Sequence, residues 1–530
     1  MKLNYKRTVF VGFAFFLITA FWQAYDSIIP IILTNKFGLA QTWSGAIMAL
    51  DNVFALLLLP VFGALSDKVN SRFGRRTPFI VVGTVCAAIL LVSLSVADNA
   101  QLKRIERVTG VEGEAYVQAL DEIWEKNPTV RDFNAEGLVA DKKPLQELIG
   151  KEEFKAIPIT VLDESGKAVT NPDYTNKVVP ARQAYAAIMT KANATPLIVF
   201  MLLLFFTLVA MGTFRSPAVA LMPDVTVKPL RSKANAVINL MGTAGGILVL
   251  LLGKLFATGS VKNAMMSYSL FFAVVAGIML VGLAVFLFTV REPRWAAEME
   301  EETKRLGLED SVERESSDSG ERKLSRAERI SLFLILASVV FWFMGYNAVT
   351  SKYSVYASTV LDVDYNMTLL IAQAAAIVAY LPVGLLSARF GRKKMILSGV
   401  VILATSFFFA SFLGAESAPL MKKLLMPVLF ALAGIGWATI NVNSYPMVVE
   451  LAQGSNVGKY TGFYYTASMA AQVVTPIFSG VLLDNISWRT LFPYATVFVA
   501  LAFVTMLFVR HGDSKPEARA TVLEGLGGGE

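Results

Sequence analysis

Cysteine, histidine and charged residues are all scarce in this chain of 530 residues. Its one cysteine, Cys86, lies inside an apolar run, which excludes a disulfide framework and a cysteine-ligated metal site. Its one histidine, His511, follows the last apolar run, so no buried histidine can act as a general base, haem ligand or zinc ligand. The sequence also lacks the glycine-rich Walker A string of nucleotide-driven pumps. We therefore expect no enzyme, no cofactor and no metal site.

Charged residues make up 17% of the chain and hydrophobic residues 55%, whereas ordinary globular chains are about 25% charged. Residues 99–192 and 291–329 together hold 49 of the 89 charged residues. The rest of the chain cannot cover itself with a hydrated surface, which excludes a soluble globular protein and a disordered one. The sequence thus predicts an integral membrane protein in a lipid bilayer. Its net charge of +7 follows from membrane topology and does not indicate nucleic-acid binding.

Apolar runs long enough to cross a bilayer recur along the sequence, since a spanning helix needs about 20 apolar residues. The runs are residues 8–34, 43–66, 77–97, 195–222, 236–257, 264–290, 330–350, 366–387, 395–414, 424–447, 460–483 and 491–510. The predicted fold class is therefore an all-α membrane protein with twelve transmembrane helices.

Lysine and arginine predict how these helices are oriented. Outside the two charged segments, 18 of them fall on the side of the termini and 6 on the other side. Because cytoplasmic loops are enriched in these residues, we expect both termini in the cytoplasm, in a plasma or inner membrane. The expected divisions are helices 1–3 (1–97), an extracytoplasmic insert (98–194), helices 4–6 (195–290), a cytoplasmic linker (291–329), a second six-helix bundle (330–510) and a cytoplasmic tail (511–530). Within the insert, spaced apolar residues near Tyr116 and a hairpin-like stretch near Gly166 predict a small folded cap.

A short motif occurs twice, six predicted helices apart. Gly63-Ala-Leu-Ser66-Asp67 is followed by Arg72-Phe-Gly74-Arg75-Arg76, and Gly384-Leu-Leu-Ser387-Ala388 is followed by Arg389-Phe-Gly391-Arg392-Lys393. In addition, Asp224 precedes Lys233 by nine residues, and Glu450 precedes Lys459 by nine. These matches predict two six-helix repeats, an arrangement typical of transporters that rock two halves about a central site.

The first copy of the motif resembles the loop between helices 2 and 3 of the major facilitator superfamily. With Pro78 and Phe79 it resembles the sucrose and glycoside-pentoside-hexuronide symporters of that superfamily more specifically. This resemblance implies a carrier that moves a sugar or glycoside by alternating access, as a monomer, with a proton or Na⁺ as the coupling ion. Plant sucrose symporters carry a coupling aspartate and a sugar-binding arginine at positions that are Leu208 and Val219 here, and the nearest charge is Arg215.

Two acidic residues lie deep in the predicted helices and mark a candidate solute site. Asp26 and Asp51 are each about eight residues, or roughly 12 Å, from the same membrane surface. A carboxylate at that depth can take up a proton or cation or accept hydrogen bonds from sugar hydroxyls, and the alternative is a structural pair with Lys254. Aromatic faces and amides suit the remaining surface of a pyranose. The expected solute site comprises Trp22, Gln23, Tyr25, Asp26, Asp51, Tyr346, Asn347 and Gln373.

The repeated loops predict a second functional region, a gate that locks the cytoplasmic ends of the helices. We expect Asp67 to meet Arg75 and Arg76, and expect two matching locks, Arg215 with Asp224 and Glu450 with Lys459. The expected gate residues are Gly63, Ser66, Asp67, Arg72, Gly74, Arg75, Arg76, Arg215, Asp224, Arg389, Gly391, Arg392, Glu450 and Lys459.

Two other functions fit the same fold class. A non-transporting receptor or sensor would use the insert as its ligand-binding module, and a multidrug or other solute exporter would use the same carrier fold.

Overall fold

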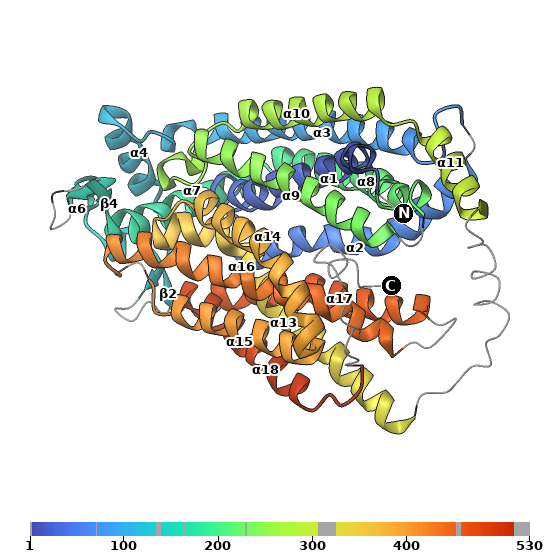
Figure 1. The fold of residues 1–530 in the computed structure, drawn as a ribbon. Helices are drawn as coiled ribbons and strands as arrows, with labels where there is room; N and C mark the ends of the chain where they lie inside the picture. The colour runs from blue at the N-terminus through green and yellow to red at the C-terminus, as the bar shows by residue number, and fades with distance from the viewer. Residues whose placement is uncertain are drawn as a thin grey trace.

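Two bundles of long helices make up the computed structural model of the chain (Figure 1). The first bundle contains α1 (Tyr5–Ile31), α2 (Gln41–Lys68), α3 (Thr77–Arg104), α8 (Thr195–Asp224), α9 (Arg231–Leu255) and α10 (Ser269–Thr289). The second contains α13 (Arg326–Tyr356), α14 (Tyr365–Phe390), α15 (Arg392–Ala410), α16 (Pro419–Glu450), α17 (Val457–Asn485) and α18 (Leu491–Leu507). The structure describes residues 3–69, 71–133, 139–162, 166, 168–227, 230–305, 325–414, 416–451 and 457–512.

Length and apolar composition agree with the predicted spans. In the described part of the chain, eleven helices are long and apolar enough to cross a membrane, and the apolar part of α14 adds a shorter one, Tyr365–Tyr380. The prediction of an all-α, twelve-helix membrane protein is confirmed.

Helix packing in the two bundles follows the same pattern. In the first bundle α1 packs on α9 and α10, α2 and α3 pack on α8, and α3 packs on α10. In the second, α13 packs on α17 and α18, α14 and α15 pack on α16, and α15 packs on α18. The first helix of each bundle also ends in a π-helical turn, η1 (Ile32–Lys36) after α1 and η6 (Ala357–Leu361) after α13. These correspondences confirm the predicted duplication.

The segment between α3 and α8 folds as a unit with its own hydrophobic core. Its elements are η2 (Glu106–Val108), α4 (Gly113–Lys126), β1 (Thr129–Phe133), β2 (Val139–Pro144), α5 (Leu145–Leu148), α6 (Lys151–Lys155), β3 (Thr160–Leu162), β4 (Ala168–Thr170), η3 (Tyr174–Val178) and α7 (Val179–Ala192). Strand β1 pairs antiparallel with β2, and β3 with β4. The apolar face of α4 supplies Tyr116, Leu120 and Ile123 to the core, and η5 (Val261–Met265) from the first bundle contributes Val261 and Met265. The insert is therefore docked on the first bundle.

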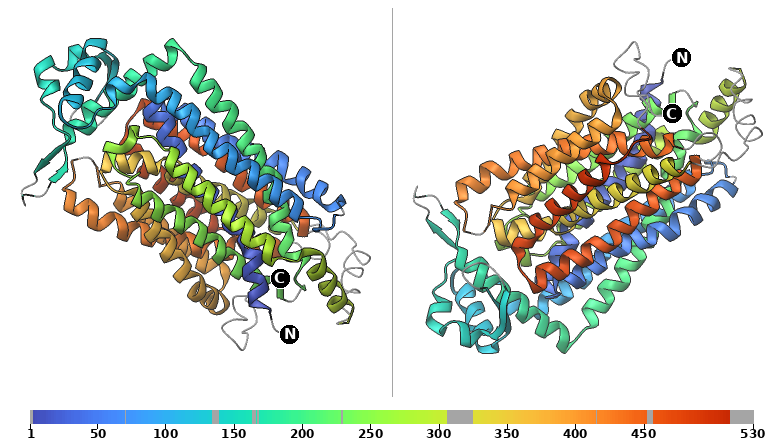
Figure 2. Two further views of the ribbon diagram at one scale, coloured as in Figure 1. Left: turned by 90° about the horizontal axis from the view of Figure 1, so that it is seen from above. Right: turned by 90° about the horizontal axis from the view of Figure 1, so that it is seen from below.

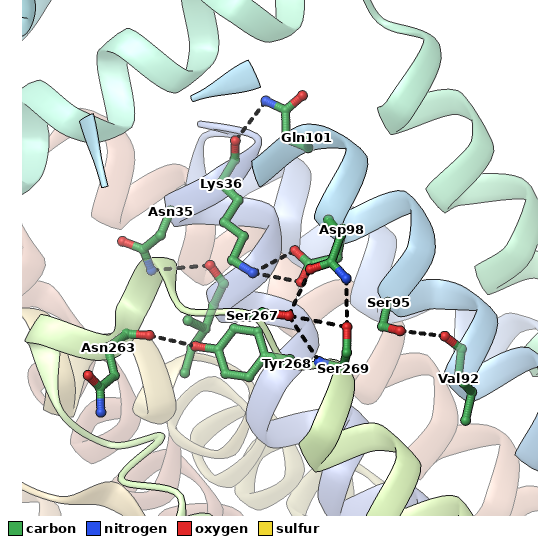
Figure 3. A network of polar contacts seen from close by, with 12 residues as sticks. Asn35, Lys36, Val92, Ser95, Asp98, Gln101, Asn263, Ser267, Tyr268 and Ser269 are labelled. Atoms are coloured by element: carbon green, nitrogen blue, oxygen red, sulfur yellow. Dashed lines mark hydrogen bonds and ion pairs between the residues drawn. The ribbon is translucent and has the colours of Figure 1, made fainter. Parts of the chain in front are cut away.

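A buried ion pair lies where the insert meets the first bundle (Figure 3). Lys36 Nζ lies 2.6 Å from Asp98 Oδ2 and 4.5 Å from the centroid of the Tyr268 ring, and both charged side chains are fully buried. Gln101 donates hydrogen bonds to the Lys36 carbonyl and to Thr190 Oγ1 of α7, each 2.9 Å long. Helix α3 therefore continues to Arg104, beyond the expected end at residue 97, because the insert buries its last turns.

The insert and the chain termini lie at opposite ends of the helices (Figures 1 and 2). We call these ends the insert side and the terminal side. The bundles meet chiefly along three helix pairs, α2 with α17, α9 with α14, and α1 with α13, and a smaller contact joins α2 to α13. From the expected linker, α11 (Glu292–Arg305) packs near the terminal end of the first bundle, whereas residues 306–324 and 513–530 lie outside the described residues.

Candidate functional site

Three charged side chains from three helices of the first bundle face one another in its middle. The side chain of Asp26 on α1 lies deep inside the protein and is nevertheless accessible to solvent, so it borders open space among the helices. The charges of Asp51 on α2 and Arg215 on α8 both act on Asp26. Asp51 itself accepts hydrogen bonds of 2.6 Å from the backbone and the side-chain amide of Asn52. Two carboxylates and one guanidinium therefore share this region, and we call Asp26, Asp51 and Arg215 the central group.

Arg215 belongs to this central group, so its expected lock with Asp224 is wrong. Its guanidinium carbon lies 5.5 Å from the centroid of the Trp22 ring, and its charge interacts with Asp51 and Asp26. Asp224 instead binds Arg76. The physical reason is helix geometry: nine residues are about two and a half turns, which puts the two side chains on opposite faces and roughly 13 Å apart along the axis.

An amide pair joins the two bundles beside these charges. Gln373 Nε2 of α14 donates a 2.6 Å hydrogen bond to Gln23 Oε1 of α1, and Gln23 Nε2 donates to Ser27 Oγ at 3.0 Å. Within the described residues, Gln373 Oε1 and Trp22 Nε1 are buried without a hydrogen-bond partner. Gly246 of α9 lies against the pair, and a Cβ there would come within 3.3 Å of Gln373 Oε1. The glycine therefore leaves room beside Gln373 Oε1, which can still accept a hydrogen bond from a ligand.

Tyr25 is a further predicted site residue, and the structure places it in the core. Its side chain is fully buried and packs edge-on against Trp22, with ring centroids 5.3 Å apart. Tyr25 thus packs against Trp22 and is not accessible to a solute in this conformation.

The predicted site residue Tyr346 belongs to a stacked aromatic pair in the second bundle. Tyr346 of α13 stacks on Trp437 of α16 with ring centroids 3.7 Å apart and planes 3° from parallel. Asn347 donates its side-chain amide to the Phe343 carbonyl of its own helix at 2.8 Å, so one of its donors is used locally. Trp437 was not among the residues expected from the sequence, where it is a lone tryptophan between small residues of a spanning helix.

Lys254 does not pair with the acidic residues of the site. Its Nζ lies 3.5 Å from the sulfur of Met367, and the side chain is exposed. The structural alternative for Asp26 and Asp51, an ion pair with Lys254, is therefore wrong.

At the terminal side, Arg76 organises the loop between α2 and α3. It lies 2.5 Å from Asp67 and 2.7 Å from Asp224, and it also donates to Ser66 Oγ and, at 3.4 Å, to the Gly63 carbonyl. Burial alone would lower the pKa of Arg76, but its bonds to Asp224 and Asp67 outweigh that effect and raise it. The predicted meeting of Asp67 with an arginine of this motif is confirmed for Arg76. Arg75 is 3.6 Å from Asp224.

Glu292, the first residue of α11, closes the same loop and was missed from the sequence. Its carboxylate accepts hydrogen bonds from the backbone amides of Arg75, Arg76 and Thr77 at 2.6–2.8 Å, and from Thr77 Oγ1 at 2.7 Å. It therefore satisfies amides at the start of α3, which have no partner within the helix. Gly74, at φ 109°, leaves space for it, because a Cβ there would lie 2.2 Å from Glu292 Cδ.

The second copy of the motif has a related backbone. Gly391 has φ 89°, and Arg389 lies over Phe390 at 5.5 Å, much as Arg72 lies over Phe73 at 4.7 Å. Arg392 begins α15. The expected lock between Glu450 and Lys459 lies outside the side chains that the structure describes.

Comparison with known families matches both halves of the chain. The model described as Major Facilitator Superfamily matches residues 183–379 and 365–526, and the model described as MFS/sugar transport protein matches residues 10–100. The chain belongs to the major facilitator superfamily. Members of this superfamily are transporters, so the expectation that the chain is a multi-pass membrane transporter and not an enzyme is confirmed.

Curated relatives match this chain over limited stretches. An uncharacterised MFS-type transporter of Bacillus subtilis, YvkA, is 27% identical over 27% of this chain and 31% of its own length. A Na⁺, Li⁺, K⁺/H⁺ antiporter of Planococcus maritimus is 30% identical over 27% of this chain and 33% of its own. A general alpha-glucoside permease of Schizosaccharomyces pombe is 42% identical over 10% of this chain and 9% of its own. The chain thus spans about a third or less of each of these relatives.

Solved structures of transporters match the whole fold. The inward-open xylose transporter XylE of E. coli has a TM-score of 0.56 at 16% identity, and the match covers 98% of both chains. A variant of the nucleoside transporter NupG has a TM-score of 0.52 at 12% identity, covering 95% of this chain and 100% of that one. At these identities the likeness establishes the shared fold.

Proposed function

We propose that the chain carries a sugar or glycoside across the membrane by alternating access of its two bundles, coupled to a proton or Na⁺. Two observations carry this proposal. Asp26, Asp51 and Arg215 form the central group of interacting charges, and a hydrogen bond between Gln23 and Gln373 joins the two bundles beside it. It lies at the junction of the bundles, where a bound solute can be exposed to one side at a time.

The chemistry of this group suits a neutral polyhydroxylated ring. Gln373 Oε1 can accept a hydrogen bond and Trp22 Nε1 can donate one, and the described residues leave both without a partner. The stacked pair of Tyr346 and Trp437 offers an aromatic surface of the kind that packs against the C–H face of a pyranose. The matched model for sugar transport proteins and the alpha-glucoside permease support the same solute class.

Charge balance supports cation coupling. Arg215 compensates one of the two carboxylates Asp26 and Asp51, so one negative charge remains for a proton or Na⁺ to neutralise. Asp26 is accessible from the open space, and therefore we assign the coupling role to it.

The test is uptake of a panel of labelled mono- and disaccharides into proteoliposomes, with and without an inward proton or Na⁺ gradient. We expect gradient-driven accumulation by the wild type, and equilibration without accumulation by Asp26→Asn. Glu416→Gln is the matched control, because Glu416 is an exposed carboxylate that pairs with Arg489, a residue of the second bundle outside the proposed site. Binding without flux under every gradient would favour the receptor function, and flux confined to drug-like cations would favour an exporter.

A further inference from the structure

The two bundles touch on the insert side where α2 begins and α17 ends. Asp484, in the last turn of α17, is 5% exposed and accepts hydrogen bonds from the backbone amides of Gln41 at 3.0 Å and Thr42 at 2.7 Å. Its second oxygen also accepts a bond from Thr42 Oγ1 at 2.7 Å. Gln41 and Thr42 are the first residues of α2, so these amides have no acceptor within their own helix.

Asp484 therefore caps a helix that belongs to the other bundle. The residue at the N-cap position of α2 is Ala40, whose methyl side chain cannot accept a hydrogen bond. A negative charge at this end also interacts favourably with the helix dipole. When the bundles separate on this side, the start of α2 loses its cap.

Lys352 of α13, also from the second bundle, holds the same peptide from its carbonyl side. Its Nζ is buried, donates a 2.6 Å hydrogen bond to the Gln41 carbonyl and is attracted by the charge of Asp484. A buried cation and a buried anion thus bind one turn of α2 and compensate each other's charge.

Glycines let the helix backbones meet directly at this point. A Cβ on Gly45 of α2 would lie 1.9 Å from the Pro476 carbonyl oxygen of α17, and one on Gly480 would lie 2.5 Å from the Gln41 carbonyl oxygen. No layer of side chains or water fits between the two backbones there. This contact holds the two bundles together on the insert side.

We propose that Asp484 and Lys352 form a latch that holds the insert side closed, and that release of the start of α2 from both residues opens the site to that side. The latch requires two moving bundles and no particular solute, so it extends the proposed function and does not depend on sugar as the substrate.

The experiment measures the distance between the bundles on the insert side by pulsed electron paramagnetic resonance. Spin labels are placed on Trp43→Cys and Ile486→Cys in a Cys86→Ser background, because both positions are exposed, at 67% and 44%, and lie at the start of α2 and just after α17. No solute or gradient is added, and therefore failure of the sugar proposal cannot produce a false result.

We expect the wild type to be mainly closed, with a short distance between the labels. Asp484→Asn keeps the shape of the side chain but loses its charge and one acceptor, and the loss of a helix cap should raise the ratio of open to closed molecules about tenfold. Lys352→Met should act in the same direction. Glu416→Gln, which breaks the exposed pair with Arg489 within the second bundle, should leave the distances unchanged.

An unchanged distance distribution in both Asp484→Asn and Lys352→Met would overturn the latch. If Asp484→Asn fails to fold, Lys352→Met together with Thr42→Val, which removes only the hydroxyl bond, decides the question. An equal widening in Glu416→Gln would also overturn it, since the effect would then be a general response to lost surface charge.

Discussion

Replacement of Glu292 by glutamine should loosen the loop between α2 and α3. The wild-type carboxylate accepts four hydrogen bonds, two on each oxygen, from Arg75, Arg76 and Thr77. Glutamine has the same shape but only one acceptor oxygen, and its amide group would face donors on the other side. The variant therefore loses at least two bonds and the negative charge at the start of α3.

The expected size of the effect follows from these bonds. A hydrogen bond to a charged group contributes about 1.5–3 kcal/mol, so two lost bonds cost about 3 kcal/mol at the lower value. A loss of that size shifts the equilibrium between the docked and released loop roughly 100-fold. Glu292 is 3% exposed, so water cannot replace the lost acceptor without the loop opening.

Hydrogen–deuterium exchange of the backbone amides of residues 75–77 measures the effect directly, since these amides donate to Glu292 itself. We expect their exchange to accelerate roughly 100-fold in Glu292→Gln. Glu298→Gln is the control on the same helix, because that partly exposed carboxylate binds Arg7 and Arg294 and not the loop. Equal exchange of residues 75–77 in wild type and Glu292→Gln would show that Glu292 does not hold the loop in place.

Three further predictions test other parts of the structure. Gly74→Ala should lower the melting temperature, because a Cβ at φ 109° is strained by about 1–3 kcal/mol and displaces Glu292. Gly277→Ala places its Cβ in open space and should leave the melting temperature unchanged, so equal melting temperatures for the two variants would contradict this reasoning. Lys36→Met should destabilise the protein by about 3–5 kcal/mol, because it leaves the charge of Asp98 buried without its partner. In thermal unfolding, the double variant Lys36→Met with Asp98→Leu should recover most of this loss, and no recovery would show that the unpaired charge does not cause the destabilisation. Hydrogen bonds from Arg294 and Arg7 lower the pKa of Glu298, which joins α11 to α1 through Arg7. Helix α11 should therefore stay docked from neutral pH to below about 4.3 and be released as the pH falls through the lowered pKa. A spin label on Glu302→Cys that becomes mobile near pH 6 would argue against this.

Much of the fold could be predicted from apolar runs and the repeated motif, because the bilayer allows few ways to satisfy a buried backbone. The duplication seen in the two RFGR loops recurs in the positive φ angles of Gly74 and Gly391 and in the matching helix contacts. The end of α3 was predicted too early, because hydropathy indicates where the apolar run ends. It does not show that Asp98 and Gln101, which follow that run, are also buried in the folded protein.

The site was predictable only in part. A charge within an apolar run is costly and so marked Asp26 and Asp51 correctly as neighbours. The pairing of Arg215 with Asp224 was predicted from their closeness in sequence and did not take account of helix faces. Because Arg215 lies on the opposite face from Asp224, it packs against Trp22 instead. Glu292 and Asp484 were missed because both look like ordinary surface charges in the sequence. Their partners are backbone amides of distant segments, which carry no signature in the side-chain pattern.

The length of α3 has a mechanical consequence. Its 28 residues extend about 42 Å, about 12 Å more than the hydrocarbon layer. The Lys36–Asp98 pair fixes the extra turns to η1, and Gln101 fixes them to Thr190 of the insert. Because the insert lies at the far end of this helix, a tilt of the first bundle moves the insert farther than it moves residues near the pivot. The same tilt pulls on the hydrogen bond from the Thr170 amide of the insert to Asp362 of the second bundle. A fluorophore on α4 would therefore report the motion of the bundle with greater amplitude than any position within the membrane.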